Sequence, residues 1–81
     1  MGRWREVWRP VRHEGAADVD YGYTFTFRSD DGREAEVNVE AASGMMMFEA
    51  DARGALRRYL DDHELPRRLV YGTDGAFHRA E

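Results

Sequence analysis

The chain contains three histidines, and two of them stand beside a carboxylate, in the pairs His13-Glu14 and His63-Glu64. Histidine and carboxylate groups are common zinc ligands, and a helical zinc motif places two histidines four residues apart. No two histidines here have that spacing, and the three fall in separate segments of the chain. The sequence also lacks cysteine, which excludes thiolate ligands, disulfides and a cysteine nucleophile. We therefore expect no metal ion and no cofactor.

Paired carboxylates could act as a general acid and a general base, and the candidates are Asp18/Asp20, Asp30/Asp31, Asp61/Asp62 and Glu34/Glu36/Glu40. Such catalysis needs a pocket that separates the pKa values of two groups. Turn chemistry explains Asp30 and Asp31, and the solvent face of a strand explains the three glutamates. No serine has the context of an exposed nucleophile, and no glycine-rich turn leads into a helix to hold phosphate. We expect no enzyme, and a small metal-dependent or hydrolytic enzyme is our third hypothesis.

The N-terminal residues 1–14 interleave arginine with tryptophan and form an arm or an edge strand, because Pro10 cannot donate to a strand ladder. Basic and aromatic side chains in alternation suit the binding of single-stranded nucleic acid. The candidate residues are Arg3, Trp4, Arg5, Trp8, Arg9 and Arg12. However, residues 14–51 hold two arginines and ten acidic residues, a net charge of −8, and the whole chain carries −4. A nucleic-acid-associated module is therefore the alternative function rather than the first.

The run Met45, Met46, Met47 and Phe48 is the least usual part of the sequence. Flexible thioethers fill irregular gaps in a core, and they also line adaptable binding surfaces. Consecutive residues cannot all point inward from one helix or strand, so at least one methionine should be exposed. We therefore expect a small non-catalytic interaction or accessory module that contacts another protein, or a second copy of itself as a homodimer, through these four residues or through the N-terminal arm.

Residues 21–40 must form a hairpin that positions this run. Aromatic residues alternate with small and polar ones from Tyr21 to Phe27, and apolar residues alternate with glutamate or asparagine from Glu34 to Glu40. A three-residue loop at 30–32, with glycine in the left-handed conformation, places every apolar side chain on one face. This register pairs Phe27 with Ala35, Phe25 with Val37 and Tyr23 with Val39. If residues 21–28 are an outer strand, their free backbone edge could also pair with another chain.

A helix is expected over residues 48–63. The positions Phe48, Ala52, Ala55, Leu56, Tyr59 and Leu60 recur at helical spacing and form one apolar stripe. Pro66 ends the helix. Residues 67–79 then predict a second hairpin, in which a three-residue loop pairs Tyr71 with Phe77.

These elements define an α+β fold of ββαββ order, an antiparallel or mixed four-stranded sheet packed on one helix, with an extended N-terminal arm or edge strand. Eighty-one residues make a single domain over 1–81. No apolar run approaches the ~20 residues of a membrane span, and arginines interrupt the N-terminal segment where a signal peptide would be apolar. We expect a cytoplasmic protein without membrane contact.

Overall fold

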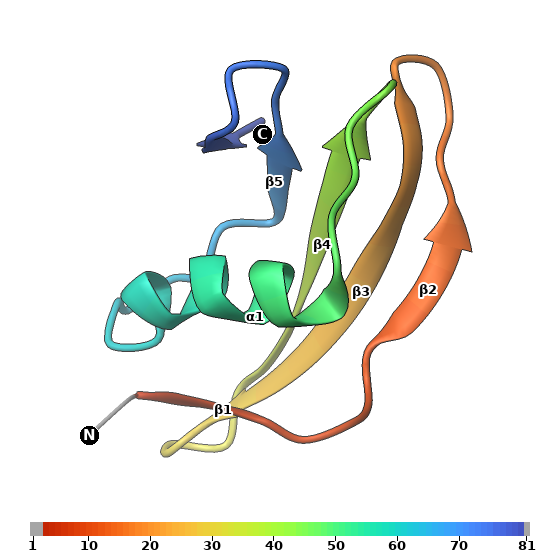
Figure 1. Cartoon of the computed structure of the whole chain (residues 1–81). Helices are drawn as coiled ribbons and strands as arrows, with labels where there is room; N and C mark the ends of the chain where they lie inside the picture. Colours follow the sequence, from red (N-terminus) through yellow and green to blue (C-terminus); the bar gives the residue numbers. More distant parts are fainter. Residues whose placement is uncertain (1–2, 81) are drawn as a thin grey trace.

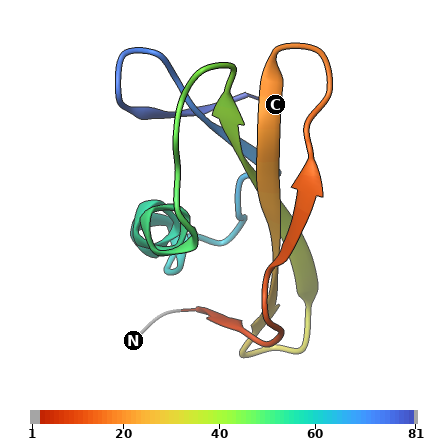
Figure 2. The same ribbon diagram turned by 45° about the vertical axis from the view of Figure 1, so that its right-hand side comes forward.

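The computed structural model describes residues 3–80, and it has an α+β fold with one helix and six strands (Figure 1). The elements are β1 (Trp4–Glu6), β2 (Val11–Glu14), β3 (Val19–Ser29), β4 (Glu34–Ala42), α1 (Glu49–Leu56), the 3-10 turn η1 (Arg57–Tyr59), β5 (Arg68–Tyr71) and β6 (Phe77–Arg79). Helix α1 lies across one face of the sheet (Figure 2). Within the described residues, no helix combines the length and the apolar character that a membrane crossing requires.

The strands form one mixed sheet in the order β1-β3-β4-β5-β6, with β2 also paired to β3. Only the β4–β5 pair is parallel among these strands, because α1 makes the crossover between them. The predicted four-stranded sheet is wrong in number, since the N-terminal arm adds two strands. Both lie on the same edge of β3, whose eleven residues are long enough to pair with the two in succession. Residues 21–28 are therefore not an outer strand, and the condition for pairing with another chain through their free edge is not met.

The β3–β4 hairpin has the predicted register, with Phe27 opposite Ala35, Phe25 opposite Val37 and Tyr23 opposite Val39. Gly32 has a φ of +89°, the left-handed conformation that the three-residue loop requires. The β5–β6 hairpin pairs Tyr71 with Phe77, and their ring centroids lie 4.8 Å apart. The alternating apolar pattern and the three-residue loops together were sufficient to predict both pairings.

The helix is shorter than the predicted span of 48–63, because α1 ends at Leu56 and a 3-10 turn follows to Tyr59. The backbone beyond this turn is held by the arm: Trp4 donates its N–H to the carbonyl of Leu60 at 2.9 Å and its indole Nε1–H to the carbonyl of Asp62 at 2.9 Å. Phe48 was expected to begin the buried stripe. Instead it is an exposed N-cap residue in extended conformation.

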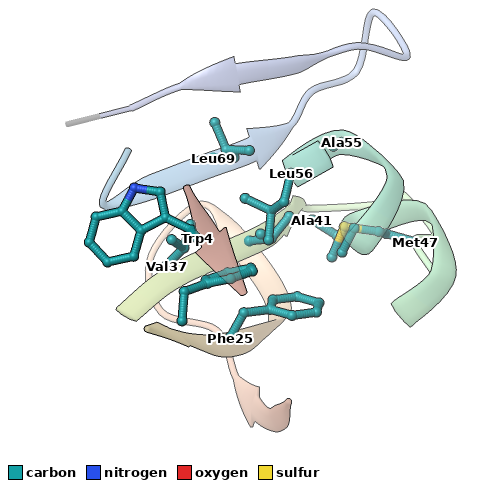
Figure 3. Close-up of a cluster of buried hydrophobic side chains, with 11 residues drawn as sticks. Trp4, Phe25, Val37, Ala41, Met47, Ala55, Leu56 and Leu69 are labelled. Atoms are coloured by element: carbon teal, nitrogen blue, oxygen red, sulfur yellow. The ribbon is translucent and has the colours of Figure 1, made fainter. Parts of the chain in front are cut away.

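The core lies between the helix and the sheet face that carries the alternating aromatic residues (Figure 3). Phe25, Val37 and Leu56 are essentially inaccessible to water, and Tyr59 packs against them at the edge. Trp4 extends this core beyond the predicted set. Its ring is buried and is contacted by the guanidinium of Arg33, 4.9 Å from the ring centroid. The N-terminal arm is thus part of the folded core.

We predict that replacing Trp4 with alanine destabilises the fold by about 3–5 kcal/mol, because it removes a large buried ring and the hydrogen bond from its indole N–H to the carbonyl of Asp62. Trp8 provides the matched control, since it is 62% exposed whereas Trp4 is 4% exposed. Trp8→Ala should change the free energy of unfolding by no more than about 0.5 kcal/mol. Urea denaturation measures both. Equal effects of the two substitutions would show that the arm does not belong to the core.

A second prediction concerns the β3–β4 turn. The buried Ser29 hydroxyl and then the Arg33 side chain hydrogen-bond the carboxylate of Asp31, which lowers the pKa of Asp31 from its ordinary value of 3.8 to about 2. This contribution to stability is complete above the ordinary value and disappears as the pH falls through about 2. Carboxyl chemical shifts followed by NMR should report this low pKa. In Ser29→Ala the pKa of Asp31 should move up toward 3.8, and an unchanged value would refute the assignment to Ser29.

Candidate functional site

The methionine run forms the loop between β4 and α1, and its residues point alternately into and away from the core. Met47 is buried, Met45 is half-buried, and Met46 and Phe48 are 71% and 63% exposed. The backbone at Met47 is fixed by Tyr21, whose hydroxyl donates to the Met47 carbonyl at 2.5 Å and accepts from the Met47 N–H at 2.6 Å. The expected exposure of at least one methionine is confirmed, and the loop that carries it is anchored to β3.

A surface hollow of about 360 Å³, which we call the junction pocket, lies beside this loop. Its walls are Arg12 from β2, Tyr21 and Tyr23 from β3, and Met45, Met46, Met47 and Phe48 from the loop. The guanidinium of Arg12 lies 4.7 Å from the centroid of the Tyr21 ring, a cation–π contact. The structure therefore brings one residue of the arginine/tryptophan arm to all four residues of the methionine run.

The six arm residues do not form one surface. Trp4 is buried in the core. Arg5, the next residue of β1, projects from the opposite face of the sheet and lies across from Arg28 in the β1–β3 register. Arg3 is exposed before β1. Trp8 and Arg9 lie in the connection between β1 and β2, close to the start of the helix. Of these six residues, only Arg12 therefore lines the junction pocket, and Trp8 and Arg9 are exposed beside the first turns of α1.

A second hollow, of about 480 Å³, separates this connection from α1 and includes an ion cluster. Arg53 donates from Nε and Nη2 to the two carboxylate oxygens of Glu6, at 2.8 and 2.9 Å, and from Nη2 to Glu49 at 3.0 Å. Hydrogen bonds to Glu6, and then to Glu49, hold the pKa of Arg53 above its ordinary value. Arg53 is therefore occupied by two carboxylates. It joins the arm to the helix rather than offering a charge to a ligand.

A third hollow, of about 440 Å³, lies around the edge of Trp4 and is lined mainly by charged residues: Arg33, Glu34, Glu36, Glu64 and Arg67, with Ala35 and Leu65. The linings of the three hollows include no histidine, serine or threonine. A contact between a histidine and a carboxylate lies elsewhere, at the exposed β5–β6 hairpin. There His78 Nε2 lies 2.7 Å from the carboxylate of Asp74, and this contact lowers the pKa of Asp74. Over residues 3–80, no three histidine, aspartate or glutamate side chains cluster closely enough to hold a metal ion.

Three wall residues of these hollows were missed at the sequence level. Tyr21 and Tyr23 were assigned only to the core face of the hairpin, and Arg53 was not among the candidate site residues. Their positions in the hollows depend on how the arm pairs with β3, and the arm has no turn signal that fixes its register. Arg12 lies opposite Tyr23 in that register, which places it beside the methionine run.

The chain was compared with protein families, with curated proteins and with solved structures, and no significant match was found in any of the three comparisons.

Proposed function

We propose that this protein is a small non-catalytic interaction module that binds protein through the junction pocket and the neighbouring Trp8. One observation carries this proposal. The large apolar side chains that are most exposed among residues 3–80 all belong to the arm or to the methionine loop: Trp8, Val11, Met46 and Phe48. Val11 projects from the other face of the sheet, because it lies opposite Thr24 whereas Arg12 lies opposite Tyr23 and lines the junction pocket. Trp8, Met46 and Phe48 come from distant parts of the chain and lie on the helix side, and exposed apolar side chains of this kind are typical of an interaction surface.

The composition of this surface supports the same proposal. Aromatic residues, methionine and arginine are the residue types enriched at protein–protein interfaces, and all three meet at the junction pocket. The bonds between Tyr21 and Met47 hold the loop backbone in place, so little backbone freedom is lost when a partner binds. Met46 remains free to adapt its side chain to the partner, because it projects into solvent.

Nucleic-acid binding through the arm is the second candidate. Trp8, Arg9 and Arg12 favour it, since they are exposed in the same part of the arm. The burial of Trp4 argues against it, because one of the two tryptophans is then unavailable for stacking on a base. A probe that reacts with either class of partner separates the two functions.

We predict that a photoreactive phenylalanine analogue at position 48 crosslinks to protein when the full chain is irradiated in its native cells. Adding Met46→Ser should lower the crosslinking yield at least about fivefold, which corresponds to the loss of about 1 kcal/mol of contact energy. Met47 is unsuitable for this substitution, because it is buried and its loss would disturb the core. Gel mobility and mass spectrometry of the adducts provide the measurement.

The control places the same analogue at Ala76, an exposed position in the β5–β6 turn. The Ala76 probe should give little adduct, and none that depends on Met46. Adducts at position 48 that contain only nucleic acid would favour the second candidate. Protein adducts of equal yield at both positions would refute a specific protein-binding surface at the junction pocket.

A further inference from the structure

β2 has an outer edge that no described strand covers (Figure 1). One hydrogen bond shows which residues of β2 direct their backbone groups toward β3. Gly15 donates its N–H to the carbonyl of Asp20 at 3.1 Å, and this bond continues the ladder between β2 and β3. Backbone groups of an antiparallel strand point alternately toward one neighbour and away from it. The odd-numbered residues of β2 therefore bond to β3, and Arg12 and Glu14 direct their N–H and C=O groups outward.

These outward groups are largely without partners inside the chain. Over residues 3–80 no backbone hydrogen bond reaches the N–H groups of Arg12 and Glu14 or the carbonyl of Arg12. The carbonyl of Glu14 lies 3.3 Å from Nδ1 of His13, and it keeps a second lone pair for another donor. The corresponding edge of β1 is different, since the outward N–H of Trp4 donates to Leu60. Among the described residues, one outward backbone group of β1 is therefore bonded within the chain, whereas no other backbone group bonds to the outer edge of β2.

We propose that this edge pairs antiparallel with β2 of a second copy of the chain, with Arg12 of each copy opposite Glu14 of the other. The inference rests on the proposed function, because it names the partner of the same surface. It adds a pair of interacting strands and their register.

Charge selects this register over the other two-fold arrangements. Residues whose backbone groups point outward must lie opposite one another in the pair of strands. A two-fold arrangement therefore places Arg12 opposite Arg12, Glu14 opposite Glu14, or His13 opposite His13 of the second copy. The first two oppose like charges, and the first also sets Glu14 against Pro10, which has no N–H to donate. The third opposes arginine to glutamate twice, and opposite charges directly across a strand pair are stabilising.

The same arrangement covers apolar surface. Antiparallel pairing of two edges places the two-fold axis perpendicular to the sheet, so both helices lie on the same face of the joined sheet. Arg12 projects from that face into the junction pocket, and Met46 and Phe48 lie beside it. The exposed residues of both loops therefore flank the seam. These residues bury apolar surface between the two copies, which stabilises a dimer that the few backbone hydrogen bonds of a four-residue strand would not hold by themselves.

Complementary charge reversals in the full chain test this pairing. Arg12→Glu gives a chain with two acids at the seam, and Glu14→Arg gives a chain with two arginines. Each variant alone should self-associate at least about tenfold more weakly than the original chain, since two attractive pairs become repulsive. An equimolar mixture should restore association, as a heterodimer of one chain of each kind. Sedimentation velocity measures the mass, and native mass spectrometry identifies the two chains.

Thermal unfolding of each variant checks that the monomer still folds, and recovery in the mixture excludes a folding defect as the cause of the loss. The proposal is wrong if the original chain stays at its 9.4 kDa monomer mass at high micromolar concentration, if either variant dimerises as well as the original, or if the mixture stays monomeric. Those results would leave the proposed function standing, since the adducts at position 48 test it separately. If the dimer forms but position 48 gives no protein adduct, the pairing holds and the role of the junction pocket fails.

Discussion

Every other element of this fold depends on the use of both edges of β3. The backbone groups of successive residues in β3 point alternately to its two edges. The Ser29 N–H donates to the carbonyl of Arg33 on the β4 side, whereas the Thr26 carbonyl accepts from the Val7 N–H on the arm side. One strand therefore bonds to the hairpin partner and to the arm at the same time. Its aromatic side chains meanwhile form the floor of the core beneath α1.

Because the arm occupies the second edge of β3, it determines what the surface of the molecule presents. β1 carries Trp4 into the core and Glu6 to the ion cluster with Arg53, so it connects the sheet to the middle of α1 and to the chain that follows η1. β2 carries Arg12 to the methionine loop. On this side of the sheet, the same pairing moves the open edge from β3 to β2. The interaction surface and the open edge are adjacent for this reason.

Local rules were sufficient for the two hairpins, and they failed where the outcome depended on distant contacts. Gly32 and the period-2 pattern determined the register of β3 and β4, and a similar loop determined the pairing of Tyr71 with Phe77. The burial of Trp4 could not be deduced, because its partners are carbonyls far along the chain, such as that of Asp62, 58 residues away and beyond the 3-10 turn. Phe48 has the spacing of a core residue. It is exposed because the chain enters the helix there in extended conformation.

Amide hydrogen exchange followed by NMR tests the two-sided pairing of β3 most directly. In dilute protein, the amides of Thr24 and Thr26, which face the arm, should exchange as slowly as those of Phe25 and Phe27, which face β4. The outward amides of Arg12 and Glu14 should exchange quickly, while that of His13 between them is protected. Rapid exchange at Thr24 and Thr26 with slow exchange at Phe25 and Phe27 would contradict the account, because the arm would then not be a lasting part of the sheet.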